Sequence, residues 1–370
     1  MTKWHKIGLV ALLSGGILAG CQNASAPAKN SSANQTASSA TATTTLPIVK
    51  TPLSRAETKL HTSVQLQIFH EGSQAEAAMN EAMDYMDEME RLLSTNKEGS
   101  DVYKINQAAG KEPVAVSDAT YAIVKQGLET AELTHGKFDI TIGAITNLWR
   151  IGDVEARKPS DAEIKAALPK IDYHRVQVDD AKKTVYLTEP GMAIELGGIS
   201  KGYIADGVRD IFAKHQVTTA IINLGGNVIV MGTSPNSSEG WKVGVQDPDE
   251  VRGETVGDRR VIDGTIVTSG IYELYVEVDG VRYHHILDPK TGYPVENDLS
   301  GTTIFTKTSM KADALSTSLF LMGTKEGLKF IEGLDGVEAV LIDKDKGVHL
   351  TSGLKGSFNL TNEGYHLVED

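Results

Sequence analysis

The glycine-rich stretch "ELGGISKGYIAD" (residues 195–206) constrains the fold and the chemistry of this chain more than any other segment. The residues before it, 193–196, predict a strand, and those after it predict a helix that starts near Ser200 and buries one apolar face. Paired glycines let another backbone or a ligand approach closely. The stretch is therefore either a tight turn with a serine cap, or an anion site at a helix N-terminus to which Lys201 adds a positive charge.

The rest of the chain mixes helices and strands without the regular alternation of a parallel α/β fold. We therefore expect an α+β fold, in one large domain that covers residues 51–370. Apolar periodicity and turn signals give the individual elements. Helices are predicted over residues 74–93, 116–134, 161–168 and 311–322, strands over 60–70, 193–196, 219–223, 228–231 and 337–342, and hairpins over 175–187 and 274–287.

The N-terminus carries the pattern of an export signal. Lys3 and Lys6 precede an apolar stretch over residues 7–18, and the chain's one cysteine, Cys21, follows directly after "LAG". The sequence "LAGC" resembles the lipobox of bacterial lipoproteins. We predict a lipoprotein signal peptide over residues 1–20, lipidation of Cys21, and a flexible linker over residues 21–50. This predicts a protein anchored by its lipid at the outer face of the cell membrane.

Composition and missing signatures exclude several classes of function. The formal net charge of -13 argues against nucleic acid as a partner, because phosphate backbones need clustered Lys and Arg. The chain has no G-x-G-x-x-G, no G-x-x-x-x-G-K-[ST], no H-E-x-x-H and no C-x-x-C. The common nucleotide, protease and redox signatures are therefore absent.

Asp313 and Thr317 stand four residues apart in "MKADALSTSLFLMG", on one face of a predicted helix. A carboxylate and a hydroxyl are hard oxygen ligands, which suit Mg²⁺ better than Zn²⁺. The same pair also fits an ordinary helix, with Asp313 in the first turn and Thr317 bonded back to the backbone. The spacing alone leaves both interpretations open.

Two adjacent histidines, His284 and His285, lie in "YHHILDPKTGYP" at the end of a predicted strand. Neighbouring strand residues point to opposite faces, so one imidazole can enter a pocket while the other faces away. A histidine beside a rigid Pro- and Gly-containing turn is a candidate general base. A purely structural histidine is the alternative.

Six blocks together resemble the ApbE-type FAD:protein FMN transferases. They occur in the order of the family: "GKFDITIGAITNLW", "ELGGISKGYIAD", "IINLGGN", "VTSGIYE", "HHILDPKTGYPV" and "ADALST". The resemblance implies a T-fold-related α+β structure with one FAD site. It also implies Mg²⁺-dependent cleavage of the FAD pyrophosphate, transfer of FMN to a Thr or Ser hydroxyl of an exported or membrane-bound acceptor flavoprotein, and release of AMP.

The resemblance also assigns roles to individual residues. The Mg²⁺ ligands would be the carbonyl of Gly198 and the side chains of Asp313 and Thr317. His285 would be the base that deprotonates the acceptor hydroxyl. The expected FAD contacts are Leu60, Asn96, Lys137, Phe138, Asp139, Glu195, Lys201, His285 and Ile286.

Some of these positions depart from the pattern of the family. Glu195 stands where Asp is common, and Lys137 where Ala is common. Leu60-His61-Thr62 replaces a usual Met-Gly-Thr, and Asn96 follows Ser94-Thr95 where the family often has an aromatic residue. These departures concern the FAD contacts and leave the predicted metal residues and His285 intact.

Two other functions stay open at this stage. An FAD pyrophosphatase would use the same site with water in place of the protein hydroxyl. A non-catalytic lipoprotein could bind FAD without cleaving it. Targets of the family carry a short Asp-Gly-x-x-x-Ala-Thr-like motif. The nearest match here, residues 263–268, lacks the Ala, which argues against self-modification.

Overall fold

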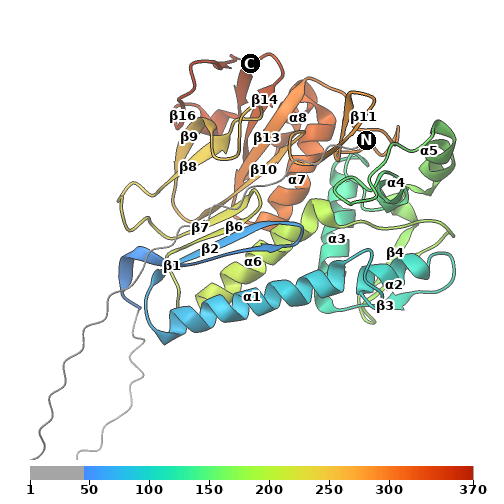
Figure 1. Ribbon diagram of the computed structural model, residues 1–370, viewed down its shortest axis with the longest axis horizontal. Coiled ribbons are helices and arrows are strands. Elements are labelled where there is room, and N and C mark those ends of the chain that lie inside the picture. Colours follow the sequence, from blue (N-terminus) through green and yellow to red (C-terminus); the bar gives the residue numbers. More distant parts are fainter. Residues whose placement is uncertain (1–45, 370) are drawn as a thin grey trace, which may run out of the picture. The chain divides into compact units, whose positions relative to one another are not determined.

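An extended, mostly antiparallel sheet runs through the computed structural model, which describes residues 46–369 (Figure 1). Only the β15–β17 pair in this sheet is parallel. In spatial order its strands are β1 (Ile48–Lys59), β2 (Thr62–His70), β6 (Ala220–Leu224), β7 (Asn227–Met231), β10 (Gly264–Gly270), β13 (Leu299–Thr306), β14 (Glu338–Asp343), β15 (Gly347–Leu350) and β17 (His366–Leu367).

Three smaller sheets accompany the large one. The first joins β16 (Phe358–Leu360), β9 (Thr255–Val261) and β8 (Trp241–Gln246). The second joins β3 (Val114–Ala115), β5 (Thr184–Leu187) and β4 (Val176–Asp179). The third is a hairpin of β11 (Tyr275–Val278) and β12 (Val281–His284) on the turn Asp279-Gly280, in which both residues have positive φ.

Helices cover one face of the large sheet, and the β8–β9–β16 sheet covers the other (Figure 1). Side chains alternate between these layers, as the two-residue period of a strand requires: Ala339 and Leu341 of β14 face the helices, while Val340 and Ile342 face β8–β9–β16. The helices are α1 (Ser73–Leu93), α2 (Asp101–Gln107), α3 (Asp118–Leu133), α4 (Gly143–Trp149), α5 (Asp161–Ala167), α6 (Gly197–Lys214), α7 (Ser309–Met322) and α8 (Thr324–Ile331). Short 3₁₀ turns cover Leu168–Lys170, Tyr173–Arg175 and Ser352–Leu354.

Helices α6 and α7 are packed so closely that only glycine fits at their crossing. A Cβ at Gly202 would overlap the backbone at Ser309 and Met310. The carboxylate of Asp206 caps α7 from α6, since its oxygens accept from the N–H groups of Ser309 (3.0 Å) and Met310 (2.9 Å). Thr308, the residue at the N-cap position of α7, makes no side-chain cap bond. Asp206 therefore satisfies donors that a helix start leaves free, and it fixes the angle between the two helices.

Most predicted elements are confirmed. The α+β class is confirmed, as are the helices that correspond to α1, α3, α5 and α7 and the two predicted hairpins. Sequence reasoning missed β1, β8, β9 and β13. Because β1 starts at Ile48, the predicted end of the linker at residue 50 falls inside a strand. The predicted signal peptide and Cys21 lie outside the described residues.

Three local predictions are wrong. Residues 193–196 form no regular strand; Ala193 makes an isolated parallel bridge to Ile142, and the Glu195 N–H donates to the Ile140 carbonyl at 2.8 Å. Helix α6 starts at Gly197 rather than near Ser200, so Ser200 is no cap. Leu60 belongs to the β1–β2 turn instead of a strand, because Leu60 and His61 both have positive φ (53° and 58°).

Among residues 46–369, no helix is both long enough and apolar enough to cross a bilayer.

Replacing Asp206 by Ala should lower the free energy of unfolding by about 1–2 kcal/mol, because the first N–H groups of α7 lose their cap. Urea denaturation would measure the loss. Asp210→Ala is the matched control: it removes a carboxylate from the same helix whose one ion pair is with Arg209 at 3.7 Å. Equal losses in the two variants would contradict the capping role.

Candidate functional site

The N-terminus of α6 and the middle of α7 bring together the residues on which the prediction of a metal site depends. Glu195 Oε1 accepts from the Gly197 N–H at 2.6 Å. Lys201 Nζ donates to the Gly197 carbonyl at 3.0 Å and lies 3.9 Å from Asp313 Oδ1. Leu196, at the N-cap position, makes no side-chain cap bond, so the serine-capped turn is wrong. The first turn of α6 is thus held by the Glu195 carboxylate, which precedes the helix, and by Lys201 within the helix.

Gly198, Asp313 and Thr317, which we call the oxygen cluster, meet on this crossing. Asp313 is buried, and its Oδ2 accepts from the Gly202 N–H at 2.9 Å. In a regular helix the Gly202 N–H would donate to the Gly198 carbonyl, four residues earlier. Asp313 therefore competes with that carbonyl for the same N–H. Thr317 Oγ1 is 3.5 Å from the position that a Cβ on Gly198 would take. Within the described part of the chain, the Thr317 hydroxyl makes no hydrogen bond.

The donor set of the oxygen cluster fits Mg²⁺. It offers one carboxylate, one free hydroxyl and one backbone carbonyl, all hard oxygen groups, and leaves room for phosphate oxygens and water. Across residues 46–369 no three His, Cys, Asp or Glu side chains gather in a metal-binding group. The oxygen cluster therefore does not resemble a zinc site, which is built mainly from nitrogen and sulfur ligands.

The segment 137–139 lies against the oxygen cluster. The buried Phe138 ring packs on Gly198, with Cε2 3.2 Å from the position of a Cβ there. Lys137 Nζ donates to the Leu321 carbonyl (3.3 Å) at the end of α7 and lies 3.6 Å from Glu326. Phe138 thus supplies an apolar wall and Lys137 a positive charge beside the predicted metal site.

Asp139 points into the protein. Its Oδ1 accepts from the backbone and the hydroxyl of Thr141 (2.8 and 2.7 Å), and its Oδ2 accepts from the Tyr173 N–H at 3.1 Å. Burial raises the pKa of Asp139, although these bonds favour its charged form. Asp139 therefore braces the segment that carries Lys137 and Phe138.

The two histidines have different hydrogen-bond partners. His284 uses both ring nitrogens within the protein: Nε2 is 3.1 Å from the Val295 carbonyl, and Nδ1 accepts from the Ile286 N–H at 3.3 Å. His285 Nδ1 is 3.2 Å from the Leu274 carbonyl, which can only accept. In the neutral ring the proton is therefore on Nδ1, and Nε2 carries a lone pair. Among the described residues, that Nε2 has no partner.

Burial lowers the pKa of His285 to about 4, and the positive charge of Lys201 contributes further to this shift. His285 is thus neutral at pH 7 and near enough to Lys201 to feel its charge. Burial also lowers the pKa of His284, but there the nearby positive charge is Lys344. Of the two imidazoles, His285 has the free lone pair that a base needs, and His284 is structural. Ile286 is buried in the core beneath them.

Leu60 and Asn96 form a separate group at the end of α1. The Leu60 N–H donates to Glu90 Oε2 at 3.2 Å, and Glu90 Oε1 accepts from Lys97 at 3.0 Å. The Asn96 N–H donates to the Ser94 hydroxyl at 3.2 Å. No hydrogen bond or ion pair in the described part of the chain joins this group to the oxygen cluster, so their FAD contacts stay predictions.

Sequence reasoning missed two residues that build the site. The Asn106 side chain clamps the backbone of Ile194, donating to its carbonyl (3.0 Å) and accepting from its N–H (2.8 Å). Asp206 fixes α7, as described above. Asp206 lies at the end of "ELGGISKGYIAD", four residues after Gly202. This position on the same helix was the signal that could have found it. Nothing in the sequence around Asn106 marks its role.

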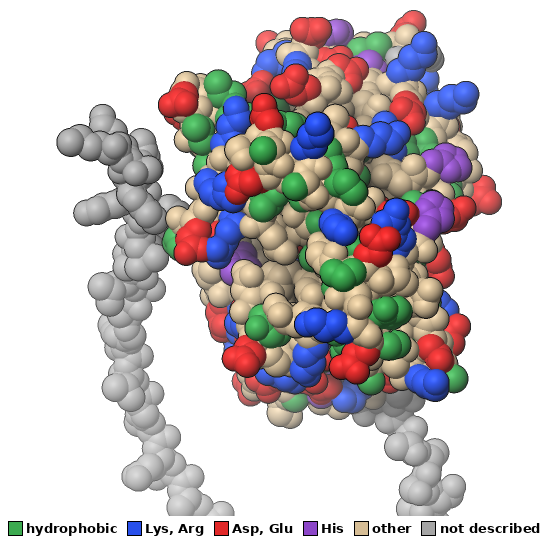
Figure 2. Space-filling model, turned by 90° about the vertical axis from the view of Figure 1, so that its right-hand side faces the viewer, with side chains coloured by type: hydrophobic (Ala, Val, Ile, Leu, Met, Phe, Trp, Pro, Cys, Tyr) green, Lys and Arg blue, Asp and Glu red, His purple; other side chains and the backbone are tan. Residues whose placement is uncertain are grey.

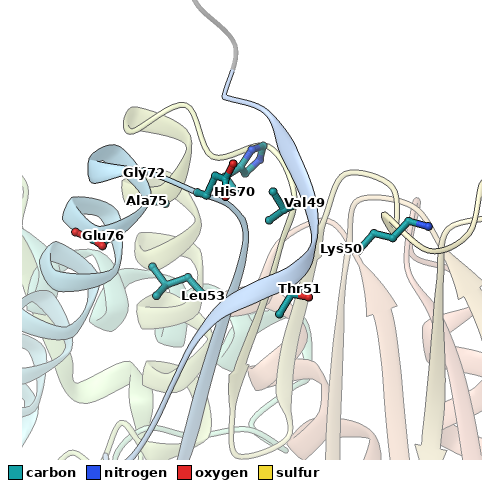
Figure 3. A pocket seen from close by; sticks show the side chains of 9 residues that line it. Val49, Lys50, Thr51, Leu53, His70, Gly72, Ala75 and Glu76 are labelled. Carbon is teal, nitrogen blue, oxygen red and sulfur yellow. The ribbon is translucent and has the colours of Figure 1, made fainter. Parts of the chain in front are cut away.

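Two cavities lie away from the oxygen cluster. One, of about 330 Å³, is at the N-terminus of α1, where Val49, Thr51, Leu53 and His70 border it (Figure 3). His70 accepts there from the Thr218 and Thr219 N–H groups (3.0 and 3.1 Å), and its Nδ1 faces the Leu46 and Pro47 carbonyls, so it has no free nitrogen. The other, of about 420 Å³, borders Glu326 and Lys329 beyond the end of α7.

Comparison with known proteins identifies relatives along most of the chain. The model of the ApbE family matches residues 60–341. An FAD:protein FMN transferase of Klebsiella pneumoniae (strain 342) is 34% identical over 297 residues, which is 80% of this chain and 92% of the relative. That of Treponema pallidum (strain Nichols) is 34% identical over 315 residues, 81% of this chain and 87% of the relative.

Solved structures give the same result for the fold. The ApbE protein of Thermotoga maritima superposes with a TM-score of 0.76 at 33% identity, covering 83% of this chain and 99% of its own. The flavin transferase ApbE from Vibrio cholerae superposes with a TM-score of 0.72 at 27% identity, covering 82% of this chain and 98% of its own.

Replacing Lys201 by Met should raise the pKa of His285 from about 4 toward its ordinary value without restoring it, because burial is the larger cause. An NMR titration of the imidazole signals, with neither FAD nor Mg²⁺ added, would measure the change. His284 is the internal control, since Lys201 is not among the charges that act on it. An unchanged His285 pKa would show that Lys201 does not face this imidazole.

Proposed function

We propose that this chain, which belongs to the ApbE family and is an FAD:protein FMN transferase, holds Mg²⁺ on the oxygen cluster and uses His285 as its general base. The observation that carries this proposal is the meeting of Gly198, Asp313 and Thr317 beside Lys201, with the free His285 Nε2 within reach of the Lys201 charge. The relatives named above are transferases, which favours a protein hydroxyl over water as the acceptor.

The reaction exchanges one phosphorus–oxygen bond for another. The acceptor hydroxyl oxygen bonds to the phosphorus of the FMN moiety, the pyrophosphate bond to AMP breaks, and AMP leaves. His285 Nε2 takes the hydroxyl proton. Mg²⁺ on the oxygen cluster supplies charge neutralisation for the pyrophosphate, which otherwise repels an incoming oxygen.

The hydrogen bonds of His285 suit this role. Its Nδ1–H is held by the Leu274 carbonyl, so the ring presents a fixed lone pair on Nε2. Burial, with a smaller contribution from the Lys201 charge, keeps the imidazole neutral while the site is empty of anions. A pyrophosphate beside Lys201 offsets that positive charge and raises the basicity of the imidazole when substrate is present.

The other residues orient FAD. Lys201, held by the Gly197 carbonyl, offers its ammonium to phosphate oxygens. The Phe138 ring gives a flat apolar surface beside the cluster. Burial raises the pKa of Glu195, whose Oε1 is engaged by Gly197, and its second oxygen can accept from the ring N–H of the flavin or the amino group of the adenine. Leu60 and Asn96 would contact FAD from the end of α1.

We also propose that the enzyme is exported, anchored by a lipid on Cys21, and modifies flavoproteins at the outer face of the membrane. The sequence "LAGC" after an apolar stretch supports this.

Replacing Cys21 by Ser should move the protein from the membrane fraction to the soluble fraction, because its acyl chains are lost. Fractionation of cells that express the full chain would measure this. Retention of the Cys21→Ser variant in the membrane would contradict the lipid anchor.

Replacing Asp313 by Asn should reduce FMN transfer and AMP release by about 100-fold or more, because Mg²⁺ loses its one charged ligand. The amide oxygen can still accept from the Gly202 N–H, so the melting temperature should change little. The assay follows acceptor mass and AMP release with FAD, Mg²⁺ and a synthetic peptide that carries an Asp-Gly-x-x-x-Ala-Thr motif. Asp210→Asn, on the exposed side of α6, is the control. Undiminished turnover in Asp313→Asn would rule out the metal assignment.

A further inference from the structure

We propose that the acceptor protein docks as an extended strand along the outer edge of β11, over an apolar rim formed by Val154, Val251, Leu274 and Tyr275. This proposal rests on the function proposed above, since it takes His285 as the base that the acceptor hydroxyl must reach. It adds the surface that recognises the acceptor and the conformation in which the acceptor binds.

The apolar rim lies around the segment that holds His285. Val154, Val251, Leu274 and Tyr275 expose 83%, 73%, 43% and 42% of their surface, whereas large apolar side chains are mostly buried in this chain. Exposed apolar groups that gather in one place mark interaction sites. Figure 2 looks at the side of the molecule where α4 and β11 lie in Figure 1, and shows apolar side chains between interspersed charges of both signs.

Three loops that are distant in sequence form the rim. Gly152 lies against Leu274, since a Cβ at Gly152 would be 3.4 Å from Leu274 Cδ1. Arg252, next to Val251, pairs with Glu273 at 2.5 Å. The loops that carry Val154 and Val251 thus both reach the start of β11. The Leu274 carbonyl, on the same short segment, holds His285 Nδ1 and accepts from the His285 N–H at 3.0 Å.

The β11–β12 hairpin has a free edge there. Hydrogen-bonded and non-hydrogen-bonded pairs alternate along an antiparallel pair. Because the His285 N–H bonds to Leu274, the pairs Tyr275–His284 and Glu277–Arg282 are non-hydrogen-bonded, and the backbone groups of Tyr275 and Glu277 face away from β12. In the part of the chain that the structure describes, those groups make no backbone hydrogen bond outside the hairpin.

A free edge with an apolar rim selects an extended partner. Main-chain bonds to Tyr275 and Glu277 would provide affinity with little sequence preference, and the rim would select a segment with apolar side chains near its hydroxyl residue. The face of the hairpin that carries Val276 and Tyr283 is not available, because these side chains pack on the Trp149 cluster. The edge begins at the residue whose carbonyl orients His285, so an acceptor aligned on it would run beside the segment that holds this imidazole.

The double variant Val154→Ser/Tyr275→Ser tests this surface. With the synthetic acceptor peptide described above, the KM for the peptide should rise about tenfold or more, while kcat and the Kd for FAD stay within about twofold, because neither residue touches the oxygen cluster or His285. The matched control is Val178→Ser/Ile262→Ser, which removes two exposed apolar side chains (37% and 54%) that are not part of the rim. Equal KM values in the two double variants would overturn the docking surface.

A second measurement tests the strand itself. The peptide, N-methylated at alternate residues before its Thr, should lose transfer in one methylation register and keep it in the other, because only one set of N–H groups faces β11. Equal transfer in both registers would overturn strand addition. Failure of the docking proposal is distinguishable from failure of the proposed function. If the unaltered enzyme neither modifies the peptide nor releases AMP, the function fails; if it does both and the variants keep its KM, only the docking surface fails.

Discussion

The hydrogen bond from the Gly202 N–H to Asp313 is the contact on which the rest of the site depends. It forms only because Gly202 has no side chain, which lets α7 cross α6 at backbone distance. At that distance a carboxylate on α7 reaches the first turns of α6, where Gly198 and Lys201 lie. Asp206 fixes the same crossing from the other end, by capping α7. The position of the carboxylate that we propose as a metal ligand thus follows directly from helix packing.

A second constraint separates the two histidines. Both rings sit beside a backbone carbonyl, which fixes the protonated nitrogen in each. The difference lies in the other nitrogen: in His284 it accepts from the Ile286 N–H, and in His285 it is free. One backbone donor, the Ile286 N–H, therefore distinguishes the structural His284 from His285, the base that we propose. Sequence position alone could not have separated them.

Elements with strong apolar periodicity could be predicted from the sequence. Segments whose backbone groups hydrogen-bond to side chains could not. Helix α1 shows its apolar stripe directly. Residues 193–196 were predicted as a strand that runs into the glycine-rich turn, but the Asn106 amide bonds the Ile194 backbone where a neighbouring strand would. The β1–β2 turn was missed because Leu60 and His61 adopt positive φ without being Gly or Asn.

Strand β13 shows a further limit, and the site shows the same one. β13 is almost wholly buried yet rich in Ser and Thr, because its hydroxyls find partners such as the Ser316 carbonyl of α7, 3.1 Å from Thr302. Because of this polar composition, the sequence did not predict β13 as a strand of the core. Likewise, the spacing of Asp313 and Thr317 did not by itself favour a metal site over an ordinary helix. The proposed site residues came from six short blocks taken together, because a tertiary constellation leaves only fragments in any one segment.

Two parts of the fold would each hold one substrate of the proposed reaction. FAD and Mg²⁺ would be held by α6 and α7, whose crossing is fixed at Gly202 and Asp206. The acceptor would meet a hairpin whose inner face packs on Trp149, and the Trp149 indole N–H donates to the Gly292 carbonyl at 2.9 Å, on the turn that follows the histidines. His285 stands between these supports, bonded to the hairpin through Leu274 and sensing the charge of Lys201 on α6. The base that we propose would thus be aligned with both substrates by contacts that neither substrate has to make.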